Sequence, residues 1–545
     1  MSVRQSVTST STHSDGYVPF PAEAAADARA QGYWAGLPLD ALLRAGARRF
    51  PDRPALLTAD GTRDYATLDA EVDRMARGLL ALDITPGDRV VVQLPNVPEF
   101  VVVLFGLLRA GLVPVLTLPA HRRAEIEHLT RLSGAVAYIA ADRVGDFDYR
   151  QLAATVQREV PSLRHVLILG EPATFTDLAT VPTSRASEIS LPQVEPSDIA
   201  LMLVSGGTTG LPKLIARTHD DYRYNATASA ELCALTADDV YLATLPAAHN
   251  FPLACPGILG VVHAGGAIAF VGDPSPESAF AAIERHRVTV TSVVPPLAQL
   301  WCAAVEWEDA DLSSLRLLQV GGAKLAEVNA RAVTSALGAT LQQVFGMAEG
   351  LINYTRLDDP AELVHATQGR PLSPADEVRV VDADGKDVAP GTEGELLTRG
   401  PYTIRGYYRA PEHNARAFTP DGYYRSGDLV RRLPSGHLIV SGRIKDVINR
   451  GGENVSCDEL EEHLLAYPGV RHAAAVGLPD DALGETVCAV LVVDGELPTL
   501  AAIKAFLTER GLATYKLPDL LRRAQSLPVT AVGKIDKKAL RASEG

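Results

Sequence analysis

Short apolar runs alternate with amphipathic stretches along most of the chain. Residues 40–50 (DALLRAGARRF) carry their apolar side chains at helical spacing, which predicts an amphipathic helix. Runs such as DRVVVQLP and VAYIAA are short, apolar and rich in β-branched side chains, as is typical of buried strands. The predicted strands lie at residues 88–95, 136–141, 163–170, 241–246, 267–272, 288–295 and 315–322. Strands that alternate with helices predict an α/β fold with mostly parallel sheets.

The pattern changes near residue 375. Residues 377–400 contain D-G and G-T turn signals between apolar runs, which predicts antiparallel hairpins. Further along, Ser456 and Glu459 have the spacing of a capping box that opens a helix. A later amphipathic helix is predicted to end on Gly511 as its C-cap. The C-terminal part of the chain is therefore predicted to be a separate small α+β unit.

These patterns predict the domain organisation. We expect an α/β protein with a large N-terminal domain of mostly parallel α/β sheets, a small β subdomain and a small α+β C-terminal domain. The predicted boundaries are a loose N-terminal tail at residues 1–16, a core at 17–442 that includes a β-rich subdomain at 375–442, and a C-terminal domain at 443–545.

Composition narrows the class of protein. The chain has 545 residues, of which 47% are hydrophobic and 21% charged, as in globular proteins. The net charge of -15 argues against nucleic acid as a partner, because a phosphate backbone requires a basic face. An acidic substrate held in a locally basic cleft remains open.

The sequence predicts neither a membrane span nor a disulfide framework. The apolar stretches 100–120 and 251–272 are interrupted by prolines, and the first also contains Arg109, so both are predicted to be a buried helix followed by a strand. The five cysteines are widely spaced with no C-x-x-C, which argues against a disulfide framework or structural zinc. No apolar signal segment opens the chain, and we predict a cytoplasmic location with no membrane association.

The strongest local motif is residues 204–213, VSGGTTGLPK. Glycines allow the backbone to approach an anion, while hydroxyl donors and a lysine suit a polyphosphate. The motif is not a Walker A loop, because Leu-Pro separates Gly210 from Lys213. Taken alone, it could equally be a flexible surface loop. The residues predicted to hold phosphate are Ser205, Gly206, Gly207, Thr208, Thr209 and Lys213.

Further motifs decide between these interpretations. Together with the glycine-rich motif, QQVFGMAEG (342–350), YRSGDL (424–429), residues 442–461 and GKIDKKAL (533–540) resemble, in order, the motifs of the adenylate-forming ligases. LPAAHNFPLACPG (245–257) and GLINYTRLDDP further resemble the stand-alone aryl-acid AMP ligases of siderophore pathways. The resemblance implies that the chain uses ATP to activate salicylate or 2,3-dihydroxybenzoate as the aryl-adenylate. It also implies transfer of the aryl group to the phosphopantetheine thiol of an aryl carrier protein.

The resemblance implies a nucleotide site. Asp428, which follows Gly427 and by itself suggests a turn, is expected to accept hydrogen bonds from the ribose hydroxyls. Arg443, otherwise a surface cation, is expected on the ribose and phosphate side. Glu349, otherwise an acid at a helix N-terminus, is expected to bind Mg²⁺, although Ala348 replaces the usual threonine before it. The remaining expected contacts are the backbone of Gly322 and Val344 and the ring of Phe345 on adenine.

Lys534 is the expected catalytic residue. Alone, the lysine-rich stretch around it would be a solvated face, but by resemblance Lys534 bridges the substrate carboxylate and the nucleotide oxygens. A cation there offsets the repulsion when a carboxylate attacks an anionic phosphate. The resemblance also implies a mobile C-terminal domain that rotates about Lys445, so that residues 451–454 replace Lys534 and line the thiol tunnel.

The acyl pocket is expected at His249, Asn250, Phe251, Cys255, Gly322, Ile352 and Lys534. His249 alone would be a buried core histidine; by resemblance it lies along the substrate carboxylate, and Asn250 offers its amide to the ortho hydroxyl. Cys255 stands where dihydroxybenzoate enzymes carry Ser and salicylate enzymes carry Cys. A 3-hydroxyl group needs a polar partner and a thiol is a weak one, so salicylate is favoured over 2,3-dihydroxybenzoate.

Other functions stay open at this point. A 2,3-dihydroxybenzoate–AMP ligase and an aryl-CoA ligase that uses free coenzyme A share the same activation motifs. A non-catalytic nucleotide-binding protein is disfavoured by the joint presence of Asp428, Glu349 and Lys534. A nicotinamide oxidoreductase is disfavoured because VGGAKLAEV is not G-x-G-x-x-G. Only residues 535–545 follow Lys534, so the carrier protein is expected to act in trans.

Overall fold

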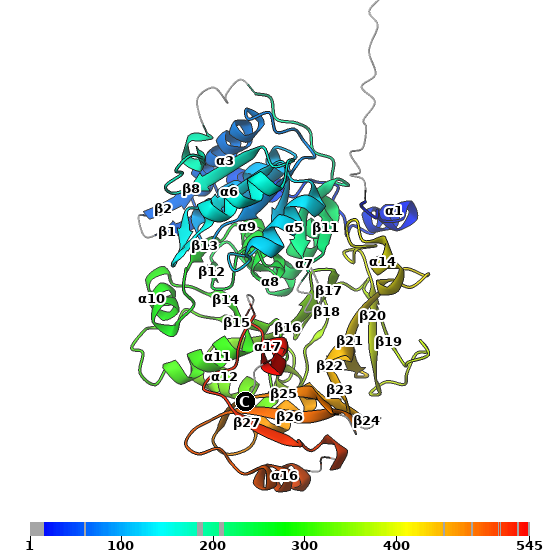
Figure 1. The fold of residues 1–545 in the computed structure, drawn as a ribbon. Coiled ribbons are helices and arrows are strands. Elements are labelled where there is room, and N and C mark those ends of the chain that lie inside the picture. The colour runs from blue at the N-terminus through cyan, green and yellow to red at the C-terminus, as the bar shows by residue number, and fades with distance from the viewer. Residues whose placement is uncertain are drawn as a thin grey trace, which may run out of the picture. The chain divides into compact units, whose positions relative to one another are not determined.

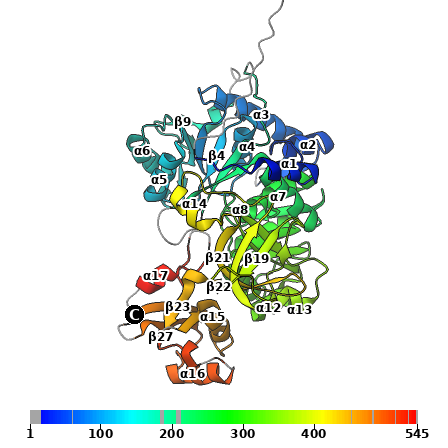
Figure 2. The ribbon, with the colours of Figure 1, turned by 90° about the vertical axis from the view of Figure 1, so that its right-hand side faces the viewer.

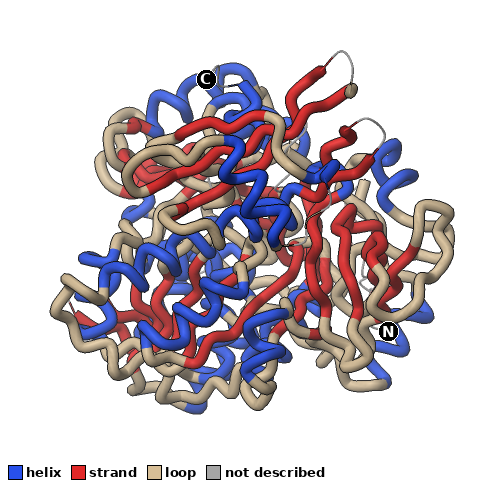
Figure 3. Tube along the Cα trace, turned by 90° about the horizontal axis from the view of Figure 1, so that it is seen from below, coloured by secondary structure: helices blue, strands red, loops and turns tan. Residues whose placement is uncertain are grey.

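The computed structural model describes residues 16–58, 61–182, 189–205, 212–450, 453–480, 483–510, 512, 514–530 and 533–542. Strands and helices occur throughout this part of the chain (Figure 3). The chain forms two compact units. The first is Met1–Gly272 together with Pro401–Phe418, and the second is Asp273–Gly400 together with Thr419–Gly545.

A seven-stranded sheet dominates the first unit, in the order β11-β10-β4-β3-β5-β8-β9. Its neighbouring strands are parallel except for the antiparallel pair β10 and β11. Helices α5 and α6 cover one side and α3 and α4 the other (Figure 2), which explains why the strands are near-continuous apolar runs. The elements are α3 (Tyr65–Leu80), β3 (Arg89–Gln93), α4 (Pro98–Arg109), β4 (Val113–Leu116), α5 (Arg123–Ser133), β5 (Ala137–Ala141), α6 (Tyr149–Glu159), β8 (His165–Leu169), β9 (Thr176–Asp177), β10 (Ile199–Val204) and β11 (Leu214–Thr218).

Four further strands of the first unit pair in the order β12-β13-β1-β2, parallel except for the last pair. Helix α9 packs against α2, α7 and α8, and this group of helices holds the segment that contains His249 and Cys255. The elements are α1 (Ala22–Ala30), α2 (Ala41–Arg49), β1 (Pro54–Thr58), β2 (Gly61–Asp64), β6 (Arg143–Val144), β7 (Phe147–Asp148), α7 (His219–Leu232), β12 (Val240–Ala243), α8 (Asn250–Ala254), α9 (Gly257–Ala264), β13 (Ala267–Phe270) and α14 (Pro411–Ala417).

The two apolar stretches are buried helix followed by strand, as predicted. Helix α4 is buried along nearly its whole length, and its last residue, Arg109, forms ion pairs with Asp40 at 3.2 Å and Asp73 at 2.7 Å. Asp69 pairs with Arg109 as well, so three carboxylates, one buried and two partly exposed, compensate one buried guanidinium. Among the described residues, no helix is both long and apolar enough to cross a membrane.

The second unit contains the strands β14 to β18, of which β14, β15 and β16 are parallel and β17 and β18 antiparallel. Helices α11 and α12 pack together against these strands (Figure 1). The elements are α10 (Pro276–His286), β14 (Val290–Val293), α11 (Pro295–Ala304), β15 (Leu317–Gly321), α12 (Glu327–Leu337), β16 (Thr340–Met347), β17 (Gly350–Tyr354), α13 (Ala361–Ala366) and β18 (Arg370–Pro371).

Two smaller sheets complete the second unit. One is antiparallel, β19-β20-β21-β22, and confirms the predicted hairpins. The other has the order β24-β23-β26-β25, with β27 added beside β26. The elements are β19 (Glu377–Val381), β20 (Glu393–Arg399), β21 (Tyr424–Arg432), β22 (Leu438–Arg443), β23 (Val447–Arg450), β24 (Glu453–Ser456), α15 (Cys457–Leu465), β25 (Val470–Asp480), β26 (Gly484–Val493), α16 (Leu500–Glu509), β27 (Leu520–Arg523) and α17 (Lys537–Ala542).

The capping prediction is half correct. Ser456 caps α15, because its hydroxyl accepts a hydrogen bond from the Glu459 backbone N–H at 3.3 Å. The reciprocal half of the box is wrong, since the Glu459 carboxylate lies 2.6 and 2.8 Å from Lys516 Nζ. An ion pair with a distant lysine competes better for this side chain than its own helix terminus does.

The α/β fold class is confirmed, and each of the seven predicted strands overlaps an observed one. The predicted tail and Gly511 fall wholly or almost wholly outside the described residues. The predicted boundary at residues 442/443 stays a prediction, as does the cytoplasmic location. The five cysteines, all described, form no disulfide: Cys233, Cys255, Cys302, Cys457 and Cys488.

Candidate active site

The predicted phosphate loop begins where β10 ends and returns at β11. The Ser205 N–H donates to the Lys213 carbonyl at 2.9 Å, and the Lys213 N–H donates to Ser205 Oγ at 3.0 Å. These two bonds close the neck of the loop and keep its ends together. Gly206, Gly207, Thr208 and Thr209 lie outside the described residues, so their contact with phosphate stays a prediction.

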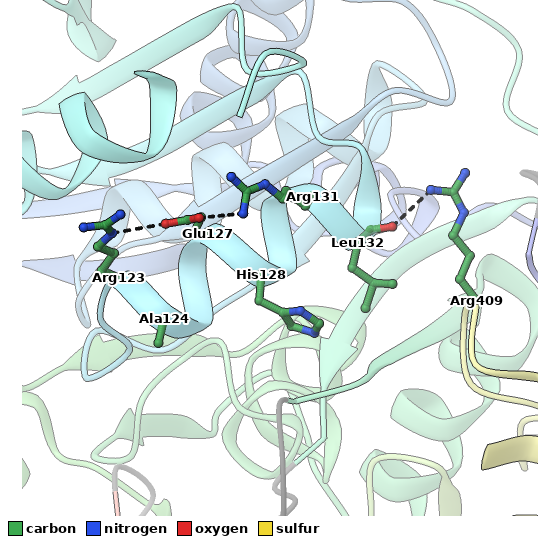
Figure 4. Close-up of a pocket in the computed structure, with 7 residues that line it drawn as sticks. All are labelled: Arg123, Ala124, Glu127, His128, Arg131, Leu132 and Arg409. Carbon is green, nitrogen blue, oxygen red and sulfur yellow. Dashed lines mark hydrogen bonds and ion pairs between the residues drawn. The ribbon is translucent and has the colours of Figure 1, made fainter. Parts of the chain in front are cut away.

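An open hollow of about 780 Å³ lies on the α5 face beside this neck (Figure 4). His128 Nε2 lies 3.0 Å from the Pro212 carbonyl. Glu127 pairs with Arg123 at 3.1 Å and with Arg131 at 2.5 Å, each one helical turn away. Exposed pairs of this kind contribute little free energy, and none of the predicted substrate residues lines the hollow. We interpret it as a solvated, basic helix face.

The acyl-pocket residues of the first unit surround α8. His249 caps this helix, with Nδ1 accepting from the Phe251 N–H at 3.3 Å. Asn250, Phe251 and Cys255 are all buried. Asn250 Nδ2 lies 3.6 Å from Cys255 Sγ, and this thiol lies 3.5 Å from the Asn250 carbonyl, to which it donates. The structure therefore brings together the two residues that were predicted to read the ring substituents.

In the second unit, Lys534 lies against Gly322. Gly322 follows β15 with φ +83°, and a Cβ placed there would lie 3.7 Å from Lys534 Cε and 3.3 Å from Val294 Cγ1. The preceding Gly533 packs on Val294 as well, since its Cβ would lie 3.0 Å from Val294 Cγ2. The absence of a side chain at both glycines thus allows the lysine to reach the end of the β15 strand.

Asp428 and Arg443 form the centre of the predicted ribose site. Asp428 is 4% exposed, and its Oδ1 accepts from Arg443 Nε at 2.8 Å. The Asp428 carboxylate is the main reason that the pKa of Arg443 is raised, and Asp446 and Glu349 add to the effect. The partly exposed guanidinium of Arg443 therefore interacts with three carboxylates of the second unit.

Two local predictions are wrong here. Asp428 does not lie in a turn: it is within β21, opposite Arg443 of β22. Gly427, with φ +71°, is accommodated inside the strand where the register of β20 and β21 shifts between Glu395 and Leu397. The alternative of a helix N-terminus at Glu349 is also wrong, because this buried residue lies in the turn that joins β16 to β17.

The strands β16 and β17 order the remaining nucleotide and acyl residues. Phe345 pairs with Asn353 across the two strands, and Gly346 pairs with Ile352. Val344 and Ile352 are buried, while Phe345 is half-buried at the edge of an apolar cluster formed with β19 to β22. A half-buried aromatic ring near the end of a strand can stack on a base, and the contact of Phe345 with adenine stays a prediction.

The predicted hinge, Lys445, lies in a 3₁₀ turn, Ile444–Asp446, between β22 and β23. A short connection of this kind is a place where a few backbone angles can change. Gly451 and Gly452 lie outside the described residues, so the predicted role of that segment in the thiol tunnel is not addressed by the structure.

Sequence reasoning missed an ion pair that anchors the C-terminal end. Lys537, three residues after Lys534, lies 2.8 Å from Glu461 Oε1 and 3.6 Å from Asp458 Oδ1 of α15. Burial is the largest single influence and lowers the pKa of Lys537, but the interactions with Glu461, Cys457 and Asp458 together outweigh it and the pKa is raised. No local signal could have found this pair, because the partners lie far apart in the sequence.

We expect Lys537→Met to lower the free energy of unfolding of the C-terminal region by about 3–5 kcal/mol, since it leaves Glu461, whose side chain is only 14% exposed, without its counter-charge. Urea unfolding, followed by the far-ultraviolet circular dichroism of the backbone, measures the change. The matched control is Lys538→Met, at an exposed neighbour, with an expected change within about 0.5 kcal/mol. Equal stability of the two variants would contradict the anchoring role.

Comparison with known proteins defines the class. Residues 43–408 match the AMP-binding enzyme family and residues 459–534 match the AMP-binding enzyme C-terminal domain. The chain therefore belongs to the AMP-binding enzymes, and within them to the aryl-acid AMP ligase branch, as the resemblance predicted.

Individual proteins of this branch are similar to the chain over nearly its whole length. The chain is 55% identical to a salicyl-AMP ligase / salicyl-S-ArCP synthetase of Mycobacterium tuberculosis, covering 96% of this chain and 94% of the relative. It is 52% identical to a 2,3-dihydroxybenzoate-AMP ligase of Bacillus subtilis, covering 96% and 97%. Among solved structures, the apo structure of Mycobacterium smegmatis MbtA is 57% identical with a TM-score of 0.76, covering 96% and 98%.

Proposed function

We propose that the chain uses ATP to convert an aryl carboxylic acid, with salicylate preferred, to its aryl-adenylate. It then transfers the aryl group to the phosphopantetheine thiol of an aryl carrier protein supplied in trans. The observation that carries this proposal is the similarity, over nearly the whole chain, to a protein named salicyl-AMP ligase / salicyl-S-ArCP synthetase. Within each unit, the contacts of Lys534 with Gly322, of Asp428 with Arg443 and of Asn250 with Cys255 support it.

The first half-reaction forms one bond and breaks another. A carboxylate oxygen of the aryl acid attacks the α-phosphorus of ATP, the bond to the bridging oxygen breaks, and pyrophosphate leaves with the electron pair. Lys534 supplies the positive charge where the two anions meet, and it acts on the rate more than on binding. Asp428 accepts hydrogen bonds from the ribose hydroxyls, and the hydrogen bond from Arg443 Nε holds its carboxylate in place.

Glu349 fits the proposed Mg²⁺ site. Its carboxylate is buried, and the described residues contain no group of three His, Cys, Asp or Glu side chains that could hold a metal without the nucleotide. Mg²⁺ typically binds one or two carboxylates together with substrate phosphate oxygens, which agrees with a single protein carboxylate. Bound there, the ion would neutralise charge on the phosphate oxygens.

In the second half-reaction, the thiol sulfur attacks the carbonyl carbon of the aryl-adenylate and AMP leaves. We propose that rotation about Lys445 withdraws Lys534 before this step, because the same cation would otherwise occupy the approach of the thiol. The position of Lys445 in a short turn between two strands supports a hinge at this point.

An acceptor competition tests the second half-reaction. The enzyme, salicylate and ATP are mixed with equal concentrations of a phosphopantetheinylated aryl carrier protein and coenzyme A. Intact-protein mass spectrometry measures the loaded carrier, and chromatography measures salicyl-CoA. We expect the carrier to be loaded preferentially, whereas preferential formation of salicyl-CoA would instead assign the chain to the aryl-CoA ligases.

Asn250 and Cys255, the two residues proposed to contact the ring substituents, support a preference for salicylate over 2,3-dihydroxybenzoate as substrate. The Cys255 thiol donates to the Asn250 carbonyl, and its sulfur faces Asn250 Nδ2. A thiol engaged in this way is a poor partner for a 3-hydroxyl group on the ring. A second hydroxyl would therefore be desolvated without an adequate hydrogen bond.

We expect Cys255→Ser to raise the ratio of kcat/KM for 2,3-dihydroxybenzoate to that for salicylate by about threefold to tenfold, the value of one ordinary hydrogen bond. Pyrophosphate release with each acid measures the ratio. Cys302→Ser, at a half-buried cysteine on α11, is the control and should leave it unchanged. An unchanged ratio in Cys255→Ser would contradict a contact between this residue and the ring substituents of the substrate.

A further inference from the structure

A buried hydrogen-bond chain leads from α7 to the proposed acyl pocket. Tyr222 of α7 is fully buried, and its hydroxyl lies 2.8 Å from Asn250 Oδ1, to which it donates. On the other side of the amide, Asn250 Nδ2 lies 3.6 Å from Cys255 Sγ. Neither the motifs of the sequence nor the proposed chemistry gives Tyr222 a role.

Both neighbours of the Asn250 amide favour the same orientation. A phenol that donates requires the amide oxygen on its side. The Cys255 thiol donates its proton to the backbone carbonyl of Asn250 at 3.5 Å. Its sulfur therefore presents lone pairs to the side-chain amide of Asn250 and favours the amide nitrogen on that side. An amide has two N–H donors and rotates by 180° only when its partners allow it, so these contacts fix which end faces the pocket.

The surroundings of Tyr222 keep its hydroxyl in the donor state. Burial raises the pKa of Tyr222 well above its usual value, so the phenol retains its proton. The Arg217 guanidinium carbon lies 4.8 Å from the centroid of the tyrosine ring, and Arg217 Nε is paired with Asp221 Oδ1 at 2.7 Å. Asp221 also accepts from the N–H and hydroxyl of Thr218, each at 2.7 Å. Ring and hydroxyl are therefore held in place.

The orientation of the Asn250 amide determines which ortho substituent of the aryl acid the pocket can accept. The ortho hydroxyl of salicylate donates its proton to the neighbouring carboxylate, so its oxygen presents only lone pairs outward. The amine of anthranilate does the reverse, because one N–H bonds to the carboxylate and the other points outward. A fixed N–H donor in the pocket wall complements the first group and opposes the second.

We propose that Tyr222 is a specificity-determining positioning residue: its hydroxyl holds the Asn250 amide with the nitrogen toward the substrate, so that the site selects an ortho hydrogen-bond acceptor. The inference rests on the proposed function, since it assumes that Asn250 faces the ortho substituent of an aryl acid. Tyr222 touches no reacting atom and acts through Asn250 alone.

The test compares kcat/KM for salicylate, anthranilate and benzoate, measured by pyrophosphate release, in wild type and Tyr222→Phe. Without the phenol the amide can turn its oxygen inward. We expect salicylate to lose roughly tenfold, anthranilate to gain, and benzoate, which has no ortho group, to change less than about threefold. Tyr224→Phe, on the same helix, is the matched control and should keep the wild-type ratios.

A double-mutant cycle separates positioning from a general structural role. In an Asn250→Ala background, Tyr222→Phe should leave the salicylate to benzoate ratio unchanged, because the amide it positions is gone. An equal loss on all three acids in Tyr222→Phe, with ratios unchanged, overturns this inference alone. A wild type that does not prefer salicylate to benzoate contradicts both this inference and the proposed function.

Discussion

Lys534→Ala is expected to lower the rate of aryl-adenylate formation by about 10²–10³-fold or more while changing the dissociation constant of ATP by only a few-fold. The reason is that the cation acts where a carboxylate approaches an anionic phosphate, and this interaction strengthens in the transition state. In the structure its side chain reaches Gly322 at the end of β15, which is consistent with such a position.

Single-turnover formation of the adenylate and equilibrium binding of a non-hydrolysable ATP analogue measure the two quantities separately. Lys538→Ala, at an exposed lysine of the same segment, is the control. Transfer of the aryl group from preformed adenylate to the carrier should persist in Lys534→Ala. Near-normal adenylate formation by this variant would contradict the assigned role.

The second large effect is expected for Asp428→Ala. The variant loses the acceptor proposed for the ribose hydroxyls and removes the carboxylate nearest to Arg443. Charge-assisted hydrogen bonds contribute about 1.5–3 kcal/mol each, so kcat/KM for ATP should fall by roughly 100-fold or more. Steady-state pyrophosphate release at varied ATP measures the loss.

A nucleotide that lacks one ribose hydroxyl tests whether Asp428 binds that hydroxyl. The wild type should discriminate against 2′-deoxy-ATP, whereas Asp428→Ala should treat the two nucleotides nearly alike, because the group that reads the hydroxyl is absent. Asp428→Asn, which keeps the shape but removes the charge, should fall between wild type and alanine. Undiminished discrimination in Asp428→Ala would place the ribose elsewhere.

The features that were predictable from sequence are local. The buried strands could be predicted because parallel strands covered on both faces, such as β3 and β5, are continuous apolar runs. The N-cap at Ser456 was predictable because its partner is three residues away. The approximate composition of the site was predictable from motif resemblance, since Asp428, Arg443 and Lys534 each stand in a recognisable segment.

Features that depend on distant partners were not predictable. Glu459 forms an ion pair with Lys516 instead of completing the capping box, and Lys537 forms an ion pair with Glu461 of α15. Asp428 was expected in a turn because Gly-Asp usually marks one, but pairing with β22 extends the strand through it. Tyr222 has no local signal, because its role depends on an amide 28 residues further along the chain. In each case a tertiary contact outweighs the local preference.

The formation of aryl-adenylates by this chain is tested most directly by ATP–pyrophosphate exchange. The assay uses the 545-residue chain with salicylate, 2,3-dihydroxybenzoate, benzoate and a fatty acid, each at matched concentration. We expect the fastest exchange with salicylate, slower exchange with 2,3-dihydroxybenzoate and little with the fatty acid. Absence of exchange with every aryl acid, or exchange led by the fatty acid, would contradict it.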